Sequence, residues 1–250
     1  MHMGKGLSIA ALIFVLALPA PADDTNTASS TATGAANSAP AVSPKTSTGS
    51  SGKILAPSND VGIGSDGAVK DQDSYQARIG ELYAPGGEAY IMPLRLPTLP
   101  EGQQIASIHL RTQLVGITNE ANGLANADLY ILGIRDTNKV LPTDYYQGTH
   151  PDSKATLIQA NFLTPASKVR TDPNTGPFIE TSADADAALT RYLNDACAKP
   201  GNAGKFVFLR VSYDVDPIPP GNNGYMLLTS GATGDNEPPI FTYTLAPSSK

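Results

Sequence analysis

Short apolar runs separated by Gly, Pro, Asn and Asp fill the chain from residue 53 to residue 245, the pattern of β-strands joined by turns. The run at 105–115 alternates, so that His109, Arg111 and Gln113 share one side of the expected strand and less polar residues share the other. We therefore expect one buried and one polar face there. Apolar residues occupy both faces of the runs at 129–134 and 205–213, which predicts central strands covered on both sides. The other expected strands lie at 88–96, 127–135, 225–229 and 240–245, with shorter ones near 75–82 and at 155–162.

One segment, 182–198, has the period of a helix. Its apolar residues fall at i, i+3, i+4, i+7 and i+8, namely Leu189, Tyr192, Leu193, Ala196 and Cys197. Thr181 and Asp184 resemble a capping box at its start, and Lys199-Pro200-Gly201 ends it. We expect the apolar stripe to pack on the sheets, with Cys197 as a small core residue. Because parallel strands need repeated crossovers, a single helix predicts an antiparallel β-sandwich with one short α-helix.

The first 52 residues have a different composition. Lys5, the apolar run Leu7–Leu18 and the small residues Ala20 and Ala22 follow the plan of a signal peptide, predicted as residues 1–22. An uncleaved N-terminal anchor is the alternative. Of the 30 residues at 23–52, 24 are Ser, Thr, Ala, Gly or Pro, which predicts a flexible linker, plain or carrying O-linked sugar. The β-sandwich domain is then expected at 53–246, and the protein outside the cell, at the cell surface or in the periplasm.

The charge of the chain limits the classes of binding partner, and its cysteine content limits the source of its stability. Without residues 1–22, 16 Lys and Arg face 23 Asp and Glu, and no basic cluster is present, so nucleic acid is disfavoured as a partner. The apolar run of the signal peptide is too short to span a bilayer, so no transmembrane anchor is expected. The single cysteine, Cys197, excludes an intrachain disulfide, and stability must come from an ordinary packed core.

Two groups of residues are candidates for ligand binding. Tyr145 and Tyr146 lie in a Pro-, Asp- and Gly-rich segment that favours an exposed loop, although one ring filling the edge of the sandwich explains them as well. The polar trio His109, Arg111 and Gln113 forms the second group. A solvated or helix-covered polar face is the competing interpretation, and Arg95 and Arg210 are candidates to join that face. The absence of Trp counts against the strongest form of a sugar-binding interpretation.

The sequence contains few motifs that would indicate catalysis or metal binding. The sequence has no G-x-S-x-G turn, and its few glutamates lie mostly beside turns or termini. The only cofactor it suggests is a structural Ca²⁺ ion, held by Asp214 and Asp216 with Asn222 and Asn223 nearby, or by the acidic group at 60–73. Asp and Asn also serve turns, which is the alternative for both groups.

The order of these elements resembles the DNRLRE-type jelly-roll modules and related carbohydrate-binding domains of bacterial secreted proteins. The most specific match is the segment 99–110, LPEGQQIASIHL, to the family pattern "lP-x-g-x-x-i-x-x-a-x-L". The helix, the apolar strand at 206–211 and the closing PPIFTYT at 238–244 also match, whereas Pro93 in the early strand and the long stretch 135–172 depart from the family. The resemblance implies a jelly roll that attaches to polysaccharide or serves as a surface structural unit.

Three functions remain open from the sequence. The first is a secreted, non-catalytic module that binds extracellular polysaccharide, and the second is a structural or adhesion protein of the cell surface or matrix. The third is a jelly-roll polysaccharide lyase, because such lyases place His, Arg, Gln and Tyr on one sheet face. Nothing in the sequence demands an enzyme. The open or covered state of the polar face at 105–115 distinguishes these hypotheses.

Overall fold

The computed structural model describes residues 51–55, 60–70, 76–80, 87–119, 124–145, 155–172, 174–214, 224–230 and 238–248, with only the backbone at 51–55 and at 70. Residues Thr46–Lys250 form one compact unit. The predicted signal peptide and nearly all of the predicted linker lie outside the described residues. The first described strand begins at Ser51, two residues before the expected start of the domain.

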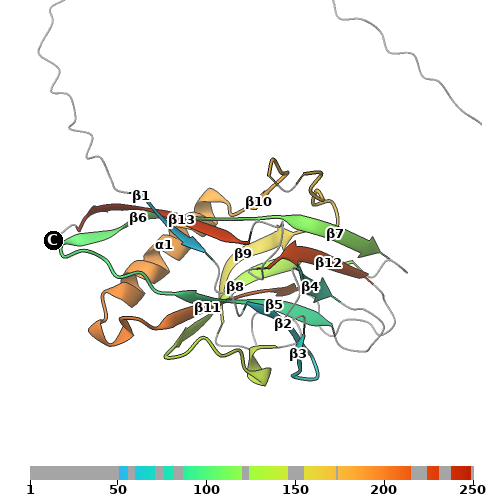
Figure 1. The fold of residues 1–250 in the computed structure, drawn as a ribbon, viewed down its shortest axis with the longest axis horizontal. Coiled ribbons are helices and arrows are strands. Elements are labelled where there is room, and N and C mark those ends of the chain that lie inside the picture. Colours follow the sequence, from blue (N-terminus) through green and yellow to red (C-terminus); the bar gives the residue numbers. More distant parts are fainter. Residues whose placement is uncertain are drawn as a thin grey trace, which may run out of the picture. The chain divides into compact units, whose positions relative to one another are not determined.

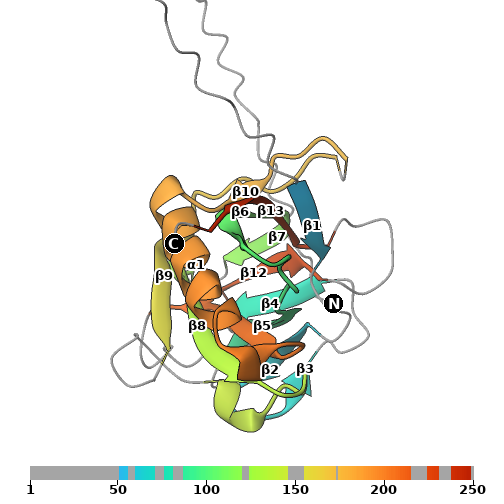
Figure 2. The same cartoon turned by 90° about the vertical axis from the view of Figure 1, so that its left-hand side faces the viewer.

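Two antiparallel sheets make up the described fold (Figures 1 and 2). The small sheet has the order β1 (Ser51–Leu55), β13 (Ile240–Pro247), β6 (Gln103–Thr112) and β10 (Ile179–Glu180). The large sheet has the order β7 (Leu114–Asn119), β12 (Gly224–Thr229), β4 (Gln76–Gly80), β5 (Glu88–Arg95), β11 (Phe206–Tyr213), β8 (Ala127–Arg135) and β9 (Thr156–Leu163). The hairpin of β2 (Val61–Gly64) and β3 (Val69–Lys70) pairs with β5. The predicted antiparallel β-sandwich with one helix is confirmed, while the jelly-roll connectivity stays a prediction.

All eight expected strands are present, with one correction. The run at 105–115 is not one strand, because the chain leaves the small sheet after Thr112, passes through Gln113 and enters the large sheet at Leu114. A single apolar run thus links the two sheets. The strands β1, β2, β3 and β10 were not expected, and each has five residues or fewer.

The main core lies between the sheets. It is built from the inward side chains of both, including Leu110 and Phe241 from the small sheet and Ile79, Leu209 and Met226 from the large one, all at most 1% exposed. A second apolar cluster covers the opposite face of the large sheet. Its buried members are Val61, Ile63, Ala89, Ile91, Val140 and Phe208. Strands β8 and β11 are therefore covered on both faces, as their sequences predict.

The helix α1 (Ala183–Cys197) packs beside β6 and β9 (Figure 2). Its buried side chains, Ala185, Leu189, Leu193 and Ala196, join the main core, as the apolar stripe predicts. The N-cap is Ser182, whose hydroxyl accepts from the Ala185 N–H, and not the expected Thr181. Within the described part of the chain, no helix is long and apolar enough to cross a membrane.

Polar side chains of the helix region complete the edge of β6. Beyond the short strand β10, no described strand pairs with this edge of β6, which lies opposite its edge with β13. Asn194 instead accepts from Ile105 N–H and donates to Ile105 C=O, both at 2.8 Å. Farther along, the hydroxyls of Thr190 and Thr181 accept from the N–H groups of the buried residues Ile108 and Leu110, at 3.1 and 3.0 Å. The helix therefore seals an edge that another strand would otherwise pair with.

Candidate functional site

A row of polar side chains runs along the outer face of the small sheet, formed by β6, β13 and β10. Its members alternate with inward residues of the main core, and cross-strand register places them in pairs. We call this row the outer strip, and it consists of Ser107 with Thr244, His109 with Thr242, and Arg111 with Glu180. The strip thus places hydroxyl, imidazole, guanidinium and carboxylate groups on one face of the sheet.

His109 is fixed at one edge of its ring. Its Nδ1 lies 2.9 Å from a carboxylate oxygen of Asp186 on α1, and because a carboxylate only accepts, Nδ1 donates this hydrogen bond. The Thr181 hydroxyl donates to the other oxygen of Asp186. The Nε2 of His109 lies 3.7 Å from Glu180, and the His109 side chain is 36% exposed. The imidazole is thus held by the helix at Nδ1 and has Glu180 beside Nε2.

Arg111 is held flat against an aromatic ring. Its guanidinium carbon lies 4.2 Å from the centroid of the Phe178 ring, and its register partner on β10 is Glu180. Stacking restricts the rotamers of this long side chain. Arg111 and His109 are therefore both positioned before any ligand arrives.

The third member of the predicted trio lies elsewhere. Gln113 is 1% exposed and sits where the chain passes between the sheets, so it does not share the face of His109. Its side-chain oxygen accepts from the Arg170 guanidinium at 3.1 Å, and its backbone C=O accepts from Thr229 N–H at 3.0 Å. Gln113 therefore joins segments inside the fold.

The two other predicted arginines also lie off the strip. Arg210 is 1% exposed on the covered face of the large sheet, where it donates to the backbone C=O of Asp144 at 3.4 Å and stacks on Tyr130. Arg95 stacks on Phe206, also in the large sheet. The expectation that they join the polar face at 105–115 is wrong, because they belong to the other sheet.

Of the two tyrosines proposed as ligand-binding residues, Tyr145 is half-buried against the second apolar cluster. The burial of Tyr145 favours the interpretation that its ring fills the edge of the sandwich over the interpretation that it is exposed for ligand binding. Tyr146 lies outside the described residues. Tyr243 on β13 pairs in register with the inward-facing Ile108, so it turns toward the core. The described residues therefore bring together the His and Arg of the lyase hypothesis, but not its Gln and Tyr.

The calcium site stays a prediction, because several of its proposed ligands lie outside the described residues. Among the described residues, no group of three His, Cys, Asp or Glu residues gathers. Asp214 lies near Asp128, and desolvation, followed by the charge of Asp128, raises the pKa of the Asp214 carboxyl. Its proposed companion Asp216 lies outside the described residues. Asp60 is buried and accepts a hydrogen bond from the Tyr90 hydroxyl, whose pKa is raised well above its usual value by burial and by the charge of Asp60.

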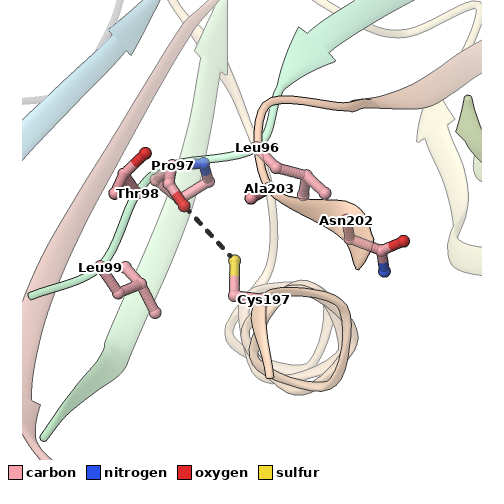
Figure 3. Close-up of a pocket in the computed structure, with 7 residues that line it drawn as sticks. All are labelled: Leu96, Pro97, Thr98, Leu99, Cys197, Asn202 and Ala203. Carbon is pink, nitrogen blue, oxygen red and sulfur yellow. Dashed lines mark hydrogen bonds between the residues drawn. The ribbon is translucent and has the colours of Figure 1, made fainter. Parts of the chain in front are cut away.

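A small pocket of about 200 Å³ lies at the end of α1 (Figure 3). Its lining residues are Leu96, Pro97, Thr98, Leu99, Cys197, Asn202 and Ala203. The Cys197 thiol points to the backbone C=O of Pro97 at 3.7 Å, and burial raises the pKa of the thiol. The half-buried Cys197 is thus held as a neutral thiol, in keeping with a packing role.

Sequence reasoning named only His109 and Arg111 and missed the other four residues of the strip, namely Ser107, Thr242, Thr244 and Glu180. Thr242 and Thr244 alternate with Phe241 and Tyr243 in the last strand. The alternation of polar and apolar residues that indicates His109 therefore indicates these two threonines as well. Glu180 carried no such signal, because its strand has only two residues.

No protein-family model matches the sequence, and no curated protein matches it. The function must therefore be inferred from the chemistry of the outer strip.

Proposed function

We propose that this chain is a secreted, non-catalytic module that binds extracellular polysaccharide, and that the outer strip is its binding surface. The observation that carries the proposal is the alignment of donors and acceptors on one partly exposed sheet face. From Ser107 to Arg111 the strip extends about 13 Å, since a strand rises about 3.3 Å per residue. This length suits a segment of an extended polymer better than a compact small molecule.

The side chains of the strip match the chemistry of sugar hydroxyl groups. Hydroxyls both donate and accept, so they are best bound by planar groups that make two hydrogen bonds and by other hydroxyls. Arg111 supplies the planar donor, Glu180 supplies the acceptor, and Thr242 supplies a hydroxyl that does both. The ring edge of His109 lies between them.

Local charge favours a neutral polysaccharide over a polyanion. The cation Arg111 is paired in register with Glu180, and His109 is bonded to Asp186, so each basic group already has an acidic neighbour. The chain as a whole carries a formal net charge of −6. The excess of acidic charge disfavours a polyanion as the ligand.

The predicted signal peptide, the predicted linker and the resemblance to DNRLRE-type modules support the same proposal. A Ser- and Thr-rich linker gives a tethered domain freedom to reach a polymer. The alternative, a structural or adhesion protein of the cell surface or matrix, is compatible with the same predicted signal peptide and linker. It differs in having no glycan ligand.

Binding to immobilised polysaccharides tests the proposal. The chain without residues 1–22 is passed over a panel of neutral and uronate-rich polysaccharides, together with Arg111→Ala and the control Arg191→Ala, which removes an exposed arginine from α1. We expect retention on a neutral polymer and a loss of about tenfold or more in affinity for Arg111→Ala, because hydrogen bonds to charged groups contribute about 1.5–3 kcal/mol. A folded wild-type protein that is retained by no polymer contradicts the proposal, and so does binding that Arg111→Ala leaves intact.

A further inference from the structure

The imidazole of His109 lies between two carboxylates that come from different elements. Its Nδ1 is 2.9 Å from Asp186 on α1, and its Nε2 is 3.7 Å from Glu180 on β10. Its neighbours within the outer strip are Arg111, two residues along β6, and Thr242, its register partner on β13. Among the described residues, these elements therefore bring two carboxylates and one guanidinium to the ring.

The surroundings of Nδ1 decide which nitrogen of the neutral ring carries the hydrogen. The Asp186 carboxylate can only accept from Nδ1. The Thr181 oxygen lies 3.4 Å from Nδ1, and because its hydrogen is donated to the other oxygen of Asp186, it too can only accept from the ring. Neutral His109 therefore has its hydrogen on Nδ1 and a lone pair at Nε2.

This lone pair lies beside a second acceptor. The Glu180 side chain is 54% exposed, and while the ring is neutral neither Nε2 nor the carboxylate can donate to the other. Two neighbouring acceptors need donors from elsewhere. Water supplies them in the free protein, and either the hydroxyl groups of a bound sugar or a proton on Nε2 can take the place of water.

Protonation of the ring changes both acceptors at once. Nε2 becomes a donor, so a sugar hydroxyl can no longer donate to it. Glu180 is close enough to form an ion pair with the imidazolium, so the sugar must compete for that carboxylate as well. The bond from Nδ1 to Asp186 exists in both states and keeps the ring in place. A proton and a sugar therefore compete for the same pair of acceptors.

We infer that the outer strip is a pH-sensitive binding surface, which binds its neutral polysaccharide when His109 is neutral and binds it more weakly when His109 gains a proton at Nε2. This inference rests on the proposed function and adds the regulation of the same site. Histidine is the side chain whose charge ordinarily changes between about pH 5 and 8, so mild acidification is enough to operate the switch.

Binding at two pH values tests the inference. Without residues 1–22 the chain has two histidines, His109 and His150, so His150→Gln is the matched control for His109→Gln. Affinity for the polymer retained in the binding panel is measured at about pH 8 and about pH 5 for wild type, both variants and Glu180→Gln. Long-range proton–nitrogen NMR of the protein without ligand identifies the protonated nitrogen of His109, and circular dichroism checks folding at each pH.

We expect wild type and His150→Gln to bind about three- to tenfold more weakly at the lower pH, the loss expected for about one hydrogen bond. The affinity of His109→Gln should not change between the two pH values, because its amide does not titrate. Glu180→Gln should show a smaller change than wild type, since an amide makes no ion pair with the imidazolium. NMR should find the hydrogen of neutral His109 on Nδ1.

Each contrary result has its own meaning. If wild type binds equally well at both pH values, or better at the lower one, the inference is wrong while the proposed function stands. A pH dependence that persists in His109→Gln, or a neutral His109 with its hydrogen on Nε2, also overturns the inference. If no polymer is retained even at the higher pH, the proposed function fails and the inference fails with it.

Discussion

The edge of β6 offers a quantitative test of how α1 stabilises the sandwich. Asn194 makes two hydrogen bonds to the backbone of Ile105, one as acceptor and one as donor, and so takes the place of a neighbouring strand. The substitution Asn194→Ala removes both bonds and keeps the helix. It leaves the N–H and C=O of Ile105, a residue that is 1% exposed, without these partners.

The expected loss of stability follows from the two bonds. Each contributes about 0.5–1.5 kcal/mol net, and a polar group left unpaired in a buried place costs about 1–3 kcal/mol. Water reaches part of this edge, and Ala is a better helix former than Asn by roughly 0.5 kcal/mol, so we expect a net loss of about 1.5–3 kcal/mol. For a domain of this size the loss corresponds to roughly 4–10 °C in Tm.

Urea unfolding followed by circular dichroism measures this loss, and the m-value is expected to stay unchanged because the folded core is the same. The control is Asp195→Ala, the next residue of α1, which is exposed. Asn194→Asp keeps the acceptor but places a carboxylate oxygen against the Ile105 C=O and a negative charge in the last turn of α1, so it should be at least as destabilising as Asn194→Ala. If Asn194→Ala is no less stable than Asp195→Ala, the side-chain bonds do not stabilise this edge and our account of the helix is wrong.

Three further predictions concern the backbone at Gly80, the charge of Asp214 and the reactivity of the Cys197 thiol. Gly80 has φ of 111°, and a Cβ there would overlap the C=O of Gly224, so Gly80→Ala should lower the free energy of unfolding by about 3 kcal/mol or more in the urea assay. The raised pKa of Asp214 means that the folded state keeps this proton to a higher pH than the unfolded state, so its contribution to stability falls as pH rises. Asp214→Asn should therefore be more stable than wild type at pH 7, by about 0.5 kcal/mol or less given the solvent exposure, with the difference disappearing near pH 4 in the same titration. Finally, the Cys197 thiol, with its raised pKa, should react slowly with a thiol reagent in the native protein and fast in urea, and equal rates would contradict a packed thiol.

Alternation of polar and apolar residues predicted the outer strip but not its limits. The rule correctly placed His109 and Arg111 on one face, because β6 is a regular strand as far as Thr112. It failed at Gln113, since the alternation continues through 112–114 while the chain changes sheets. The partner that fixes Gln113 is Arg170, 57 residues away, which no local pattern indicates.

Arg210 shows a different limit of sequence reasoning. The sequence predicts that its strand, 205–213, is covered on both faces, and the structure confirms this. Arg210 is nevertheless a candidate for the polar face at 105–115 on sequence grounds, since an arginine is seldom fully buried. Burial of Arg210 depends on the ring of Tyr130 and on the backbone C=O of Asp144, which come from separate segments. Short strands were missed for a related reason: β10 has two residues and exists only through its pairing with β6.

The position of α1 explains how the small sheet can keep a polar face open to a ligand without offering an edge to other chains. A helix lying over the face of β6 would have hidden the outer strip, whereas a helix absent from the edge would have left its N–H groups ready to pair with a foreign strand. By packing beside β6, the helix seals the edge through Thr190 and Asn194 and supplies Asp186 to hold His109. The same element therefore blocks strand addition and orients a residue of the proposed binding surface. Substitutions that loosen α1 should therefore weaken the protection of the β6 edge and the positioning of His109 together. The reason is that α1 bonds both to the backbone at the edge of β6 and to the His109 side chain on its outer face.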